Sequence, residues 1–171
     1  DRDALGEPVR VSTDVLLRVL ACGIGDDAFF DAAATKHLLN SRRFFAQYPF
    51  TAVAMDDPRF DPHASANTWG GATTMLSVLR APDAFEAHGR YVELGWALWP
   101  ALSALGRDPR FAQTLDPWVG AAGFSADHAP AALALLDLVE RCCGVLPRYD
   151  GTIWVTGSRH GAVEASVPAD S

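Results

Sequence analysis

The sequence predicts an all-α domain that forms part of an (α/α) barrel, and three observations lead to this fold class. Apolar residues recur at spacings of three and four through most of the 171 residues. Helix start and stop signals bracket these segments. The helices are joined alternately by short turns and by long loops, as in a toroid of paired helices whose long loops collect at one end. One short strand or hairpin is expected near the C-terminus.

Two helices are predicted in the first forty residues. Residues 12–14, Ser-Thr-Asp, offer an N-cap for a helix over residues 15–20. Asp26 or Asp27 then caps a second helix that extends to Leu38. The intervening glycines are typical stop signals, so the two helices form a hairpin.

The middle of the chain predicts a loop, a helical segment and a long helix. Residues 48–66 contain three prolines but are too apolar for disorder, which indicates an ordered, packed loop. Helical sequence follows over residues 72–79, and Pro82 suits the first turn of a further helix that runs to about Leu105. Two adjacent apolar stripes predict that this helix is buried around much of its circumference. Pro100 is expected to kink it or to end it early.

The C-terminal third predicts one more helix and a strand. The helix covers residues 129–143 and stops at Gly144, and an alternating strand lies within residues 149–156. We therefore expect a single domain over residues 1–157 and a disordered tail over residues 158–171.

Composition limits the classes of partner. The formal net charge is −7, which argues against nucleic acid or an anionic membrane, and no apolar run approaches the ~20 residues of a membrane span. Cys22, Cys142 and Cys143 fit neither a disulfide framework nor a zinc site, so we expect buried thiols in a reduced compartment, the cytoplasm. The five histidines lack metal-ligand spacing, and there is no phosphate-binding glycine pattern. Neither a metal nor a cofactor is implied.

One short motif points to carbohydrate. In the segment over residues 67–71, a flat indole, Trp69, stands beside Gly70 and Gly71, with the amide of Asn67 upstream. Sugars stack their C–H faces on aromatic rings and offer hydroxyls to convergent polar groups. A buried tryptophan at a helix entry, with Asn67 as the helix cap, is the alternative interpretation.

Several segments resemble, in order, the C-terminal portion of trehalase-like and mannosylglycerate-hydrolase-like glycoside hydrolases, which are six-hairpin (α/α) barrels. The segments are Val-Ala-Met-Asp-Asp-Pro over 53–58, Asn-Thr-Trp-Gly-Gly over 67–71, Phe-Ala-Gln-Thr-Leu-Asp-Pro over 111–117, Val-Gly over 119–120, and Gly-Val-Leu-Pro over 144–147 followed by Asp150-Gly151. The resemblance extends over about residues 13–156. It implies hydrolysis of α-linked glucosyl or mannosyl bonds by an inverting mechanism, which uses two carboxylates.

The resemblance also implies roles for individual residues. Gln113 falls at the position of the catalytic base, where an amide cannot accept the proton at neutral pH, and the acid of these enzymes lies upstream of this chain. A shifted alignment would put Asp116 at the base position instead. Trp69 would be a stacking wall, with Gly70 and Gly71 letting the backbone approach the sugar, and Asn67 and Asp57 would contact hydroxyls.

The sequence is compatible with three functions. The first is an incomplete or inactive piece of a glycosidase, and the second is a carbohydrate-binding remnant without chemistry. The third is a structural half-barrel that a partner chain completes. A half-barrel exposes helix faces through which copies could self-associate. A purely structural role is the alternative for Asp56-Asp57-Pro58 and for Asp116-Pro117, in which these residues form turns.

Overall fold

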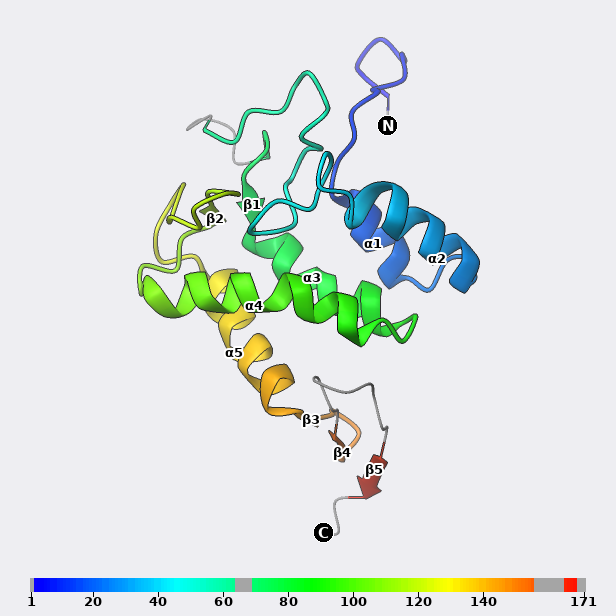
Figure 1. Cartoon of the computed structure of the whole chain (residues 1–171), viewed down its shortest axis with the longest axis vertical. Coiled ribbons are helices and arrows are strands. Elements are labelled where there is room, and N and C mark those ends of the chain that lie inside the picture. The colour runs from blue at the N-terminus through cyan, green and yellow to red at the C-terminus, as the bar shows by residue number, and fades with distance from the viewer. Residues whose placement is uncertain (1, 64–68, 156–164, 169–171) are drawn as a thin grey trace.

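The computed structural model describes residues 2–63, 69–155 and 165–168, and most of these residues belong to helices or to the loops that join them (Figure 1). The helices are α1 (Val15–Ala21), α2 (Asp27–Ala33), α3 (Met75–Glu86), α4 (Tyr91–Arg107) and α5 (Ala129–Cys143). A short π-helical segment, η1 (Ala34–Leu38), continues α2. The prediction of a mainly helical domain is confirmed.

Helix α3 is the centre of the packing, since it contacts α1, α4 and α5. Its buried residues include Val78, Ala81 and Phe85. The Phe85 ring meets the Phe30 ring of α2 edge-on at 5.4 Å and stacks on Phe50 at 5.9 Å. Helix α2 and the long loop after it are therefore packed on α3 by aromatic contacts.

Several predicted helix ends are confirmed by their local geometry. The Asp26 carboxylate accepts a hydrogen bond from the backbone N–H of Phe29, as an N-cap does. Gly144 ends α5 in the left-handed conformation, with φ of 74°. Asp14 precedes α1, but its side chain makes no cap hydrogen bond. The segment after Leu38 forms hydrogen-bonded turns.

The two prolines of the middle region behave differently from the prediction. Pro82 lies inside α3 rather than at the start of a long helix, and a turn around Gly89 (φ 64°) separates α3 from α4. Pro100 lies inside α4, which continues to Arg107. Each proline removes one backbone hydrogen bond, but buried residues before and after it hold both halves of each helix on the core.

The strands are short. Strand β1 (Thr73–Thr74) pairs with β2 (Thr114–Leu115), and β3 (Val145–Pro147), β4 (Thr152–Val155) and β5 (Ala165–Pro168) form an antiparallel sheet in that order. Strand β4 confirms the predicted C-terminal strand. Strand β5 lies within the segment expected to be a tail, and the other residues of 158–171 lie outside the described residues.

The prediction that the three cysteines are buried was wrong. All three cysteines are free thiols, as expected, but Cys22 and Cys143 are exposed and Cys142 is half-buried. Cys22 follows α1 and Cys143 ends α5, where the helices leave the core.

Among the described residues, no helix is both long and apolar enough to cross a membrane.

Candidate functional site

The long loops gather at one end of the helices, where α3 begins and α4 ends (Figure 1). Strands β1 and β2 join these loops, with Thr73 opposite Leu115 and Thr74 opposite Thr114. Just beyond the pair, the backbone N–H of Met75 donates to the carbonyl of Gln113 at 3.0 Å. The Trp69–Gly71 segment and the Gln113 segment, far apart in sequence, are thereby brought to the same end of the molecule.

Gly71 is needed for close packing, and Gly70 contributes a backbone hydrogen bond. A Cβ on Gly71 would lie 2.8 Å from the Phe60 ring and 3.0 Å from the backbone nitrogen of Pro62. The carbonyl of Gly70 accepts a hydrogen bond from the N–H of Asp61 at 2.8 Å. Both glycines are buried, whereas Trp69 remains 39% exposed. A partly exposed indole can offer a stacking face, and the alternative of a fully buried tryptophan is wrong.

Asn67, predicted as a hydroxyl contact, lies outside the described residues.

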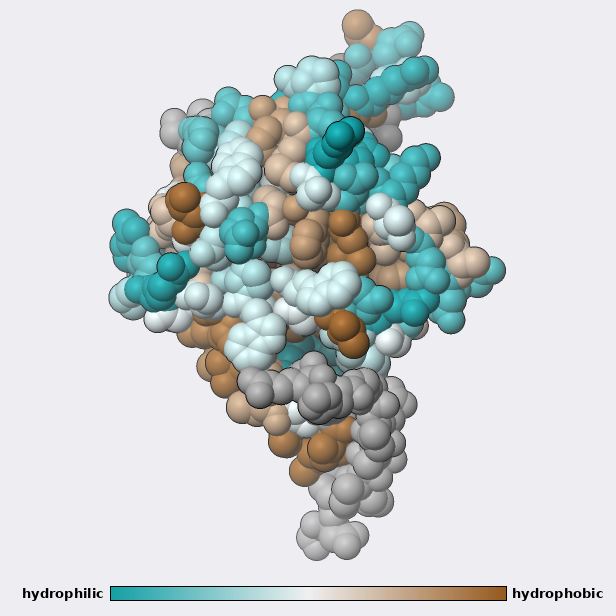
Figure 2. Space-filling view, in the orientation of Figure 1, coloured by the Kyte–Doolittle hydropathy of each residue, from teal (hydrophilic) through white to brown (hydrophobic). Residues whose placement is uncertain are grey.

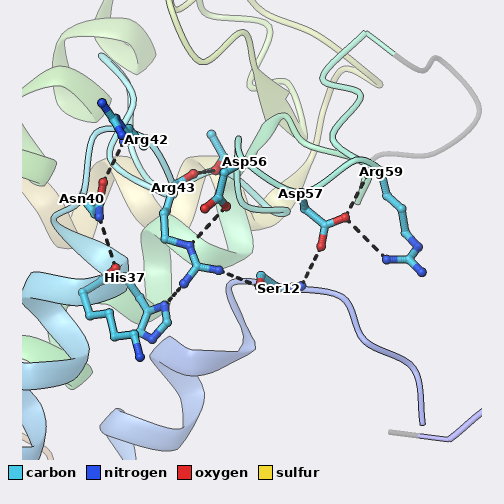
Figure 3. Close-up of polar contacts among 10 residues, drawn as sticks. Ser12, His37, Asn40, Arg42, Arg43, Asp56, Asp57 and Arg59 are labelled. Carbon is cyan, nitrogen blue, oxygen red and sulfur yellow. Dashed lines mark hydrogen bonds and ion pairs between the residues drawn. The ribbon is translucent and has the colours of Figure 1, made fainter.

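Asp57 is held in a hydrogen-bond network between the long loop and the N-terminal segment (Figure 3). Its carboxylate accepts from the backbone N–H of Ser12 at 3.1 Å and from that of Arg59 at 3.0 Å. The Arg59 guanidinium lies 3.5 Å away. Hydrogen bonds from the backbone N–H groups of Arg59 and Ser12 lower the pKa of Asp57, so the carboxylate stays ionised. Its role as a sugar contact stays a prediction.

The neighbouring carboxylate, Asp56, points to a different partner. Arg43 donates from Nε to Asp56 at 3.2 Å and from a terminal nitrogen to Ser12 Oγ at 2.8 Å, and it also contacts His37 Nδ1 (Figure 3). The two adjacent aspartates therefore have different direct partners, and their hydrogen bonds meet at Ser12.

Gln113 lies in a hydrogen-bonded stretch of backbone. Its N–H donates to the carbonyls of Phe124 and Ser125 at 3.0 and 3.1 Å. Next to it, the Thr114 hydroxyl accepts from the N–H of Phe124 at 2.8 Å. The Gln113 residue is half-buried. Its amide can donate and accept hydrogen bonds, but it cannot act as a general base.

Asp116 has a structural role in the same loop. One carboxylate oxygen accepts from the backbone N–H groups of Trp118 and Val119 at 2.8 and 2.9 Å, which closes a turn. The other oxygen lies 3.8 Å from Nδ1 of His63. Trp118 packs edge-on against Phe60 at 5.8 Å and is 47% exposed. Trp69 and Trp118 are thus two partly exposed indoles on loops that meet at Phe60.

A buried carboxyl beneath this end was not identified from the sequence. Asp14 is 7% exposed, and its carboxylate accepts a hydrogen bond from Ser77 of α3. Burial raises its pKa, although the bond from Ser77 opposes the shift. The sequence pattern indicated a cap for α1, and a partner 63 residues away leaves no local signal.

A cavity of about 310 Å³ lies at the opposite end, where α3 ends and α4 begins. It is bordered by Asp83, Glu86 and Tyr91 and by Arg148, whose guanidinium lies 4.1 Å above the Trp154 ring. Within the described ranges, no group of three or more His, Cys, Asp or Glu residues is arranged to hold a metal ion.

No family model matches this chain, and no curated protein sequence does so either. Solved structures do match. The GH63 mannosylglycerate hydrolase from Thermus thermophilus in complex with glucose aligns with a TM-score of 0.65 and 21% identity, over 78% of this chain and 32% of that one. The same hydrolase with Tris and D-glycerate gives 0.63 and 24%, over 77% and 30%. A structure named sialidase gives 0.65 and 15%, over 87% and 15%.

These likenesses concern the fold, because the identities are below 25%. The chain spans about a third of the length of the Thermus hydrolase. It therefore has a glycoside-hydrolase-like fold, that of part of an (α/α) barrel.

Proposed function

We propose that this chain is a glycoside-hydrolase-like domain whose loop end forms one wall of a carbohydrate pocket. One observation carries the proposal: the β1–β2 pairing joins the Trp69–Gly71 segment to the Gln113 segment. The exposed part of Trp69 would stack on a sugar ring, and the Gln113 amide would bond its hydroxyls. The Thermus structures contain glucose and glycerate, which supports a small polyhydroxylated ligand.

The proposed reaction of the intact protein is inverting hydrolysis of an α-linked glucosyl or mannosyl bond. Such a reaction needs one carboxylate to activate water and another to protonate the leaving oxygen. In this chain an amide occupies the proposed base position, and the Asp116 carboxylate accepts hydrogen bonds from the backbone of the turn that follows it. We therefore propose that the chain alone binds carbohydrate without cleaving it. The cytoplasmic location expected from the sequence stays a prediction.

The binding function is tested by titrating the purified chain with glucose, mannose or trehalose while following tryptophan fluorescence. The expected result is a saturable change that Trp69→Ala abolishes. Trp154→Ala, at the opposite end of the helices, is the matched control and should keep the response. A response that persists in Trp69→Ala but disappears in Trp154→Ala would place the ligand at the other end and refute the proposal.

A separate experiment tests the proposal that the chain alone does not cleave glycosidic bonds. Incubation with aryl α-glucosides and α-mannosides should release no aryl alcohol. Turnover that co-purifies with the chain through successive columns would contradict the assignment of Gln113. Turnover that Asp116→Asn removes would support the shifted alignment instead.

A further inference from the structure

Helix α4 is apolar on two sides, and the described part of the chain packs on one of them. Its buried side packs on the core through Leu94, Leu98 and Leu105. On another side, Val92, Trp96 and Trp99 follow each other at spacings of four and three and are 52%, 55% and 48% exposed. A helix that is apolar around most of its circumference is normally covered around most of it.

Helix α5 extends this uncovered surface. Leu133, Leu136 and Val139 are 55%, 62% and 43% exposed and recur every three residues, so they lie on one side of the helix. A groove between the helices is lined by Gly95 and Trp99 of α4 and by Cys142 of α5, among others. We call the six exposed apolar side chains, together with Gly95, the α4–α5 face. Figure 2 shows brown surface along α5 directly below the paler surface over α4.

Gly95 is a second feature of α4 that favours a partner at this face. It lies inside α4, where glycine weakens a helix relative to alanine. No described atom comes within 4 Å of the position that a Cβ would occupy. The packing within the described chain therefore does not require glycine there. A glycine on an apolar stripe does allow another backbone to approach closely.

The size and charge of the face suit contact with an identical face. Aromatic side chains have areas of about 150–250 Å² and aliphatic ones are smaller, so the exposed fractions correspond to at most roughly 600 Å² on each copy. Two copies would bury at most roughly 1,200 Å², which reaches the range of specific protein interfaces. No member of the face is charged, and the exposed Glu140, four residues after Leu136, borders it on α5. At the rim of the groove, Arg141 is paired with Glu86 and Asp137.

We infer that the α4–α5 face is the interface of a homodimer in which a second copy of α4 crosses the first near Gly95. A two-fold contact of this kind presents the same patch on both copies. Trp96 and Trp99 flank the crossing and lose their exposure to water. This inference does not depend on the carbohydrate proposal, because the face is distinct from the Trp69 and Gln113 segments.

Sedimentation of the full 171-residue chain over a wide range of concentration tests the interface. The wild type should sediment as a dimer, and Trp96→Glu should weaken the dimer about tenfold or more, as expected for a central aromatic contact. Gly95→Leu should weaken it as well, because its side chain would occupy the space needed by the partner backbone. Ile24→Glu is the matched control, since Ile24 is 54% exposed but follows α1, outside the face.

Circular dichroism separates loss of the interface from loss of the fold. Gly95→Leu adds a helix-favouring residue in open space, so it should keep the helical signal and melt cooperatively. A wild type that stays monomeric at all concentrations would overturn the inference. So would a dimer that Trp96→Glu and Gly95→Leu leave as tight as the control.

Discussion

Replacing Gly71 by alanine should damage the loop end, because the site has no room for one methyl group. The new Cβ would lie 2.8 and 2.9 Å from two carbons of the Phe60 ring and 3.0 Å from the backbone nitrogen of Pro62. The ring could turn, but the Pro62 backbone has to move. Overpacking of this kind costs about 1–3 kcal/mol. The comparison variant is Gly95→Ala, whose Cβ meets nothing within 4 Å and which should gain roughly 0.5–1 kcal/mol from helix propensity.

Urea denaturation at low protein concentration, followed by far-ultraviolet circular dichroism, measures both variants. The free energy of unfolding should fall for Gly71→Ala and rise slightly for Gly95→Ala. The fluorescence response to sugar should weaken in Gly71→Ala alone, because the Phe60–Pro62 segment moves beside Trp69. Equal stability of wild type and Gly71→Ala, with an unchanged sugar response, would refute the reasoning about this turn.

Three further predictions concern charged or polar groups. Burial raises the pKa of Asp14, so the folded state favours its neutral form; its stabilising contribution is present below about pH 4 and is lost as the pH rises through the raised pKa. The stability of the wild type relative to Asp14→Asn should therefore increase as the pH falls from neutral, as urea titrations at several pH values will show. Arg141→Met should cost about 2–3 kcal/mol, since it leaves Glu86 and Asp137 partly buried without their cation, and urea denaturation measures the loss. Gln113→Glu should retain the fold but give no hydrolysis of aryl α-glycosides by this chain alone, because one carboxylate of the proposed pair is still missing.

Each of these predictions has a contrary outcome. A wild type that loses stability relative to Asp14→Asn on acidification would mean that the carboxyl is held ionised. Arg110→Met removes an exposed partner of Asp108 and should change stability little, so an equal loss in both arginine variants would contradict the role of burial. Hydrolysis by Gln113→Glu would show that the chain contains the acid as well.

Much of the helical framework could be predicted because its signals are local. The Asp26 cap and the Gly144 stop act within one turn of helix, and both were identified correctly. Pro82 and Pro100 were misjudged because the local cost of proline is outweighed by packing along α3 and α4. Tertiary burial decides such cases, and a window of a few residues does not contain it.

The candidate site was only partly accessible from sequence. The order of motifs pointed to Trp69 and Gln113. Their segments reach the same end of the molecule through two-residue strands separated by about forty residues, and such short strands leave no periodic pattern. The bond between Asp14 and Ser77 is similarly long-range. The α4–α5 face was missed for another reason. The helix up to about Leu105 was expected to be buried around much of its circumference, whereas about half of Trp96 and of Trp99 is exposed.

The proposal that the loop end forms one wall of a carbohydrate pocket is tested most directly by nuclear magnetic resonance of the tryptophan indole N–H groups. The chain has five tryptophans, so each signal can be assigned by substitution. On titration with glucose, mannose or trehalose, the indole of Trp69 and the side-chain amide of Gln113 should shift together with one saturation curve, while the indole of Trp154 stays unchanged. Shifts confined to Trp154, or none at Trp69 and Gln113 at saturating sugar, would contradict the account.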